Sequence, residues 1–127
     1  MTGPVLVPIA DRSGVVLDVP GWPTGVPGLV IIEAPRGVAE PAVCDGSWSV
    51  VHARSGNRLS YCMPDPEGAL GLALALRDVT DWQQPAGDVR EALRAGAHES
   101  AVAPFRLWRC VHKNGRGVSE RDNGVIA

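Results

Sequence analysis

The chain has 127 residues, of which 45% are hydrophobic and 20% are charged, and its formal net charge is −2. These values are typical of one globular domain and exclude a disordered tail, while the near-neutral charge gives no reason to expect a polycation. No apolar run reaches the ~18–20 uninterrupted residues that are needed to span a bilayer.

The first predicted elements are two strands, residues 5–10 and 15–19, which are rich in β-branched side chains. The short segment between them, residues 11–14, contains Asp, Ser and Gly, and this arrangement is typical of a β-hairpin. Pro8 has no N–H to donate to a neighbouring strand, so we expect the first strand to lie at an edge of the sheet or to be broken there.

The next segment, residues 20–28, combines three prolines with three glycines around Trp22, and this composition predicts a rigid loop. Residues 29–34 form a compact apolar run of strand length that Pro35 closes. Residues 35–47 return to the composition of a loop.

A second hairpin is predicted where residues 48–54 and 58–63 flank a Ser-Gly turn. A two-residue turn at residues 55–56 would make one face of this hairpin apolar and aromatic; a three-residue loop would break that alignment. The cross-strand pairs expected for the two-residue turn are Trp48 with Met63, Val50 with Tyr61, and His52 with Leu59. The opposite face would carry Ser49, Ser60 and Cys62.

The clearest helix signal follows directly. Asp65 is a suitable N-cap, and Pro66 fits the first helical position. The helix predicted over residues 66–79 is apolar nearly all round, so we expect it to be buried on more than one side against the sheet.

A shorter helix is predicted over residues 88–95, with Asp88 as its N-cap and Gly96 just past its end. After Pro104, residues 105–112 read as a last strand. The expected fold is α+β, with a five- or six-stranded, mostly antiparallel sheet packed by one buried helix and a short second helix.

We expect a single domain over residues 1–127. Its parts are a β-rich segment 1–47, a ββα unit 48–82, and a segment 83–127 that holds the short helix, the last strand and the tail.

Motifs for metal or catalytic chemistry are weak. Cys110 and His112 form the one close pair of metal-ligating types, whereas zinc sites normally use two such pairs, so we predict no metal site and no cofactor. No nucleophile motif or phosphate-binding loop is present, and we assign no catalytic residue. His52 is interpreted as a core histidine, with a general base as the alternative.

Basic and aromatic residues indicate a possible nucleic-acid surface. Basic groups supply phosphate contacts, and aromatic faces stack on unpaired bases. The candidate contacts flank the hairpin tip and continue in the C-terminal part of the chain, and they are Arg54, Arg58, Arg106, Arg109, Lys113 and Arg116.

Four tryptophans outnumber the other aromatic residues together. We expect most of them to fasten loops onto a core of smaller side chains. Trp22, on its proline-rich loop, and Trp108 are the candidate exposed anchors for a protein partner.

The hairpin with an opening Trp and a Gly turn, followed by a helix, resembles the ββα pattern of AP2-like arm-binding modules of integrases, over less than a third of the chain. The alanine-, glycine- and arginine-rich composition, with a Trp-x-Val-Val-His, Ser-Gly, Asp-Trp layout, also resembles small accessory proteins of actinobacterial phages, plasmids and integrative elements. The first resemblance implies DNA binding, and the second implies a phage or mobile-element origin.

The leading functional hypothesis is a non-enzymatic binding or regulatory protein that acts through contacts with a protein partner. A nucleic-acid-binding module is the alternative, and a small enzyme is third. The odd number of cysteines and the lack of a basic N-terminal signal predict a cytoplasmic protein without a disulfide framework. The sequence does not determine the oligomeric state, and it leaves a homodimer as an open alternative.

Overall fold

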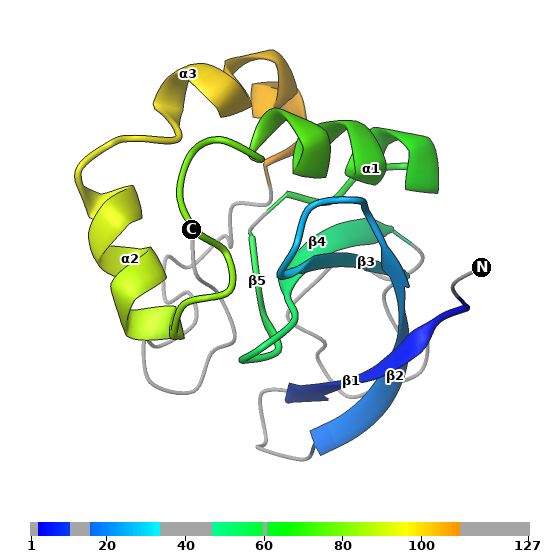
Figure 1. Cartoon of the computed structure of the whole chain (residues 1–127). Helices are drawn as coiled ribbons and strands as arrows, with labels where there is room; N and C mark the ends of the chain where they lie inside the picture. The colour runs from blue at the N-terminus through cyan, green and yellow to red at the C-terminus, as the bar shows by residue number, and fades with distance from the viewer. Residues whose placement is uncertain (1–2, 11–15, 34–46, 60, 110–127) are drawn as a thin grey trace.

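The structure is a computed structural model that describes residues 3–10, 16–33, 47–59 and 61–109. Five strands and a helical layer make up this part of the chain (Figure 1). The strands are β1 (Val5–Ala10), β2 (Val16–Pro23), β3 (Leu29–Glu33), β4 (Trp48–His52) and β5 (Asn57–Arg58). The helices are α1 (Pro66–Ala75), α2 (Ala86–Arg94), α3 (Glu99–Val102) and the 3-10 helix η1 (Ala103–Trp108). The predicted α+β class is confirmed.

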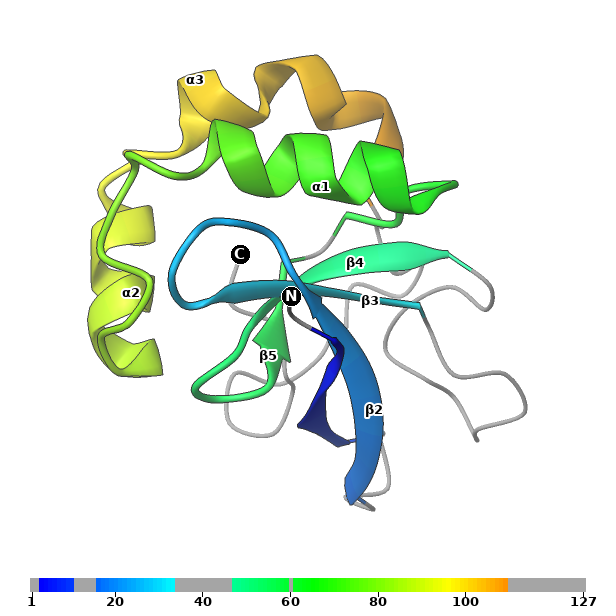
Figure 2. The same cartoon turned by 45° about the vertical axis from the view of Figure 1, so that its right-hand side comes forward.

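All five strands form one antiparallel sheet in the order β1-β2-β3-β4-β5. The sheet is curled, and Figure 2 shows β1 and β2 turning away below β3 and β4 while α1 lies across the opposite side. The curl brings the turn before β5 against β1, since a Cβ on Gly56 would lie 2.0 Å from the carbonyl oxygen of Pro8. No helix in the described ranges is both long and apolar enough to cross a membrane.

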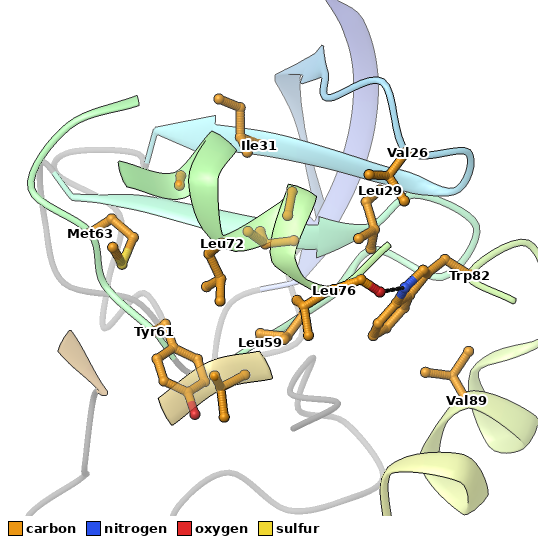
Figure 3. Packing of buried hydrophobic residues seen from close by; sticks show 14 of the residues in the cluster. Val26, Leu29, Ile31, Leu59, Tyr61, Met63, Leu72, Leu76, Trp82 and Val89 are labelled. Atoms are coloured by element: carbon orange, nitrogen blue, oxygen red, sulfur yellow. Dashed lines mark hydrogen bonds between the residues drawn. The ribbon is translucent and has the colours of Figure 1, made fainter. Parts of the chain in front are cut away.

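The curled sheet has apolar side chains on both faces. The outer face of β3–β5 packs against the helices, and the cluster there includes Leu29, Ile31, Val50, Leu59, Leu72, Leu76 and Trp82 (Figure 3). The inner face holds a second cluster formed by Val7, Ile9, Val19, Val30, Ile32 and Val51. Strand alternation separates the two sets, because neighbouring residues of one strand point to opposite faces.

The strand β2 is longer than the sequence predicted, because it continues through Pro20 to Pro23. The prediction of a loop there was wrong. β2 pairs with β1 through residues 16–21 and with β3 through residues 21–23, so the two ladders overlap only at Gly21. Each proline can therefore leave one side of the strand unpaired, which is how a sheet tolerates a residue without an N–H. The edge position predicted for Pro8 is confirmed, since β1 ends the sheet.

In the second hairpin, the cross-strand pairing follows one register far from the turn and another register next to the turn. The predicted pair of Trp48 with Met63 is confirmed. Nearer the turn, His52 lies opposite Asn57 and not the predicted Leu59, because the connection spans residues 53–56 rather than two residues. The shift is two residues, so it leaves each side chain on its predicted face.

Helix α1 begins as the sequence predicts. The Asp65 carboxylate accepts a hydrogen bond from the backbone N–H of Gly68 at 2.7 Å, and Pro66 occupies the first turn. The helix packs on β3 and β4 and touches α3. Its regular part ends at Ala75, four residues before the predicted end, and buries the apolar residues Ala69, Leu72 and Ala73.

The C-terminal elements differ most from the prediction. Helix α2 begins at Ala86, so Asp88 lies within its first turn and Pro85 takes the N-cap position. Gly96 has a φ of 83° just past the helix, as predicted. Instead of a strand from residue 105, the chain forms α3 and η1, and among the described residues of this segment only Arg109 makes a bridge, to Tyr61. Residues 110–112 of the predicted strand lie outside the described residues.

Candidate binding surfaces and buried polar groups

An apolar strip lies on the outer face of the β1–β2 ribbon. Trp22 lies opposite Ile31 in the ladder, so it is on the face that α1 covers over β3 and β4. On β1 and β2 this face is open, and Leu6 and Trp22 are 67% and 42% exposed. Leu6 lies opposite Pro20, two residues from Trp22 on the same face. We call Leu6, Pro20 and Trp22 the ribbon surface.

The other candidate anchor, Trp108, ends η1. It is 43% exposed and follows Leu107, which is almost fully exposed. Its carbonyl oxygen accepts a hydrogen bond from the Cys62 backbone N–H at 2.8 Å, which ties the end of η1 to the hairpin. Arg106 and Arg109, on either side, are exposed. These three residues are exposed, but Arg106 and Trp108 lie on a 3-10 helix and not on the predicted strand.

The two arginines expected at the hairpin tip are in different environments. Arg54 is exposed, and its Nη1 donates a hydrogen bond to the carbonyl oxygen of Gln83 at 3.0 Å. Arg58 is 1% exposed, so its guanidinium cannot reach a phosphate at the surface, and its place in the nucleic-acid surface is corrected. The alternation of β5 explains this, because Arg58 lies opposite Val51 and shares its inner face. Lys113 and Arg116 lie outside the described residues.

His52 is fully buried and uses both ring nitrogens. Its Nδ1 lies 2.7 Å from the Ser55 hydroxyl, and its Nε2 lies 3.0 Å from the Gln84 carbonyl oxygen. Because a carbonyl oxygen can only accept, Nε2 carries the proton and Nδ1 accepts from the hydroxyl. The ring thus joins the turn after β4 to the segment before α2. This supports the interpretation as a core histidine rather than a general base.

Burial lowers the pKa of His52 from its ordinary value of 6.5, and the nearby charges of Arg54 and Arg90 lower it further, although the carbonyl bonds partly oppose this. The folded state therefore holds the neutral ring, while the unfolded chain binds a proton below about pH 6.5. Stability should be fully present above that pH and should fall as the pH drops below it, by at most about 1.4 kcal/mol per pH unit from this group. Urea titrations between pH 5 and 8 measure the effect. His52→Gln should lose this part of the pH dependence, and an unchanged dependence in the variant would contradict the assignment.

The predictions on metal binding and on the cysteines concern residues that are only partly among those described. Within the described ranges, no three His, Cys, Asp or Glu side chains are placed to hold a metal ion. Cys62 is disulfide-bonded, although the odd number of cysteines predicted no disulfide framework. Cys44, Cys110 and His112 lie outside the described residues.

A scan of the chain against protein-family models, a search of curated proteins and a search of solved structures find no match. The resemblances to integrase arm-binding modules and to actinobacterial mobile-element proteins therefore stay predictions.

Sequence reasoning missed two buried polar groups. Ser49 and Arg58 lie on the inner sheet face, and neither the Ser49 hydroxyl nor any nitrogen of the Arg58 guanidinium has a hydrogen-bond partner in the described part of the chain. The alternation of side chains along the hairpin placed Ser49 on the face opposite the apolar one, and this was the available signal. The alternation does not show that the curl of the sheet buries this opposite face and makes it a second core.

Proposed function

We propose that this protein is a non-enzymatic binding protein that acts through contacts with a protein partner, and that it docks through the ribbon surface. The observation that carries the proposal is the exposure of Trp22 and Leu6 on a sheet face that α1 covers further along. Trp is enriched among the residues that dominate binding energy, because its large face excludes water from a contact. An exposed Trp beside a Leu and a Pro is suited to this role.

The charge beside the ribbon surface indicates the chemistry of the partner. Within β1 and β2, Asp18 is the only charged residue, and it lies on the same outer face as Trp22. At about 3.3 Å per residue, the carboxylate is roughly 13 Å along the strand from the tryptophan. We therefore propose an apolar partner segment that carries a basic residue about four extended positions from its main apolar side chain.

The test begins with a photo-crosslinking amino acid at position 22 and continues with the purified crosslinked partner. Trp22→Ala should weaken binding of that partner by about 30-fold or more, as expected for a central anchor, and Leu6→Ser should weaken it less. Asp18→Asn should reduce the salt dependence of association. Isothermal titration calorimetry measures each affinity.

Leu74→Ala is the matched control, because Leu74 is 43% exposed but belongs to α1. This variant should bind like the wild type. Equal affinities of the Trp22→Ala variant and the wild type would refute the ribbon surface as the docking site.

A nucleic-acid-binding role is the second candidate, and the observation that favours it is the exposure of Arg106, Trp108 and Arg109 within four residues. Two bases beside an aromatic face suit a single-stranded nucleic acid. Fluorescence anisotropy with a labelled oligonucleotide should show binding that falls steeply with salt and that Arg109→Ala and Trp108→Ala weaken. Arg77→Ala, at an exposed arginine after α1, is the control. No binding at low salt would exclude this role.

A further inference from the structure

The inner face of the curled sheet contains a cation. Arg58 extends from β5 on the same side as Val51, and it is 1% exposed. Its Nε, Nη1 and Nη2 atoms have no hydrogen-bond partner among residues 3–10, 16–33, 47–59 and 61–109. A guanidinium offers five N–H donors, and a buried group of this kind is normally paired.

Arg58 keeps its charge in this environment. Burial lowers the pKa of Arg58 to about 10, which still leaves the group protonated at neutral pH. A buried charge without a partner carries a large free-energy cost in general, because the hydration that it loses is not replaced. An anion that contacted the guanidinium would offset that cost.

The surroundings of Arg58 restrict what such an anion can be. The inner face is otherwise apolar, with side chains from four strands, and these are Val7, Ile9, Val19, Val30, Ile32 and Val51. Ser49 adds one hydroxyl on this face of β4. It is two residues before Val51, which lies opposite Arg58, and the Ser49 hydroxyl has no hydrogen-bond partner in the described ranges. Diagonal neighbours of this kind are about 7–8 Å apart, so both side chains can reach one small group between them.

We propose that the inner face of the curled sheet binds the carboxylate of a small apolar acid, with Arg58 and Ser49 donating hydrogen bonds to its oxygens. A carboxylate carries one charge, which one guanidinium neutralises, and its two oxygens match the planar guanidinium fork. A phosphate dianion would keep a second charge in an apolar surrounding. The valine and isoleucine side chains suit the hydrocarbon part of the acid.

The experiment measures thermal unfolding of the dialysed protein with sodium acetate, butyrate, hexanoate or phosphate, at constant ionic strength made up with chloride. The wild type should show a saturable rise in Tm that is larger for butyrate and hexanoate than for acetate, because ligand binding to the folded state stabilises it. Arg58→Met should weaken the apparent affinity at least about tenfold, the loss expected for hydrogen bonds to a charged group. Arg77→Met, at an exposed arginine, is the control and should respond like the wild type.

A second measurement applies if Arg58→Met does not fold. In the wild type, the side-chain Nε–H NMR signal of Arg58 should shift on titration with hexanoate, and that of Arg77 should not. No saturable rise in Tm with any acid, or equal responses of the wild type and Arg58→Met, would overturn the proposal. A rise with phosphate that equals the rise with hexanoate would overturn the assignment to a carboxylate.

Discussion

Replacing Trp82 with alanine is expected to lower the free energy of unfolding by about 3–5 kcal/mol, the usual cost of removing a buried aromatic side chain. Trp82 is 1% exposed and lies between the end of α1 and Val89 of α2 (Figure 3). Its indole Nε1 donates a hydrogen bond to the carbonyl oxygen of Leu76 at 2.8 Å. The side chain therefore connects two helices and adds a second hydrogen bond to a helix-terminal carbonyl, which also accepts one from the Val79 backbone N–H. Guanidinium titration followed by circular dichroism measures the loss.

Trp82→Phe separates the two contributions. Phenylalanine keeps most of the apolar contact but cannot donate to Leu76, whose carbonyl keeps its bond from Val79, so this variant should lose about 0.5–1.5 kcal/mol. A loss below about 1 kcal/mol in Trp82→Ala would contradict the central position of this side chain in the core.

Gly56→Ala is the second substitution with a large expected effect. Gly56 has a φ of 77°, and a Cβ there would lie 2.0 Å from the Pro8 carbonyl oxygen. Left-handed backbone costs a side-chain-bearing residue about 1–2 kcal/mol. Displacing the neighbouring strand adds a cost similar to overpacking, about 1–3 kcal/mol. We expect a total loss of about 2–5 kcal/mol in urea titrations.

Gly25→Ala is the matched control for this substitution. Gly25 has a similar φ of 86°, but a Cβ there would meet no atom within 4 Å. It should lose only the conformational part, about 1–2 kcal/mol. If both variants lost the same free energy, the contact between the turn and β1 would not contribute to stability.

Local sequence signals predicted the elements that local chemistry determines. The Asp65-Pro66 pair identified the start of α1, and the apolar run from Leu29 identified β3, because caps and strand-length apolar runs are properties of short segments. The pairing of Trp48 with Met63 followed from matching two apolar faces. The ribbon surface was predicted only at Trp22, which was expected to be on a loop.

The errors arose where tertiary contacts decide the structure. Pro20 and Pro23 looked like loop residues, and their tolerance in β2 depends on which side of the strand is paired. The segment after Pro104 has an apolar composition that fits a strand or a helix, and it forms η1. Arg58 looked like a surface base at a hairpin tip, since sequence alone does not show that the sheet curls over its position.

The single residue shared by the two ladders of β2 has a consequence for motion. Gly21 is where the β1–β2 ribbon joins the rest of the sheet, and a Cβ there would approach Val7 and Val30 to 2.7 and 3.0 Å. Because β2 pairs with β3 only at residues 21–23, opening the ribbon as a unit breaks few backbone hydrogen bonds to β3, although it also removes Val7, Ile9 and Val19 from the inner cluster. Amide hydrogens of β1 would then exchange with solvent through a partial opening, whereas those of β4 would wait for global unfolding.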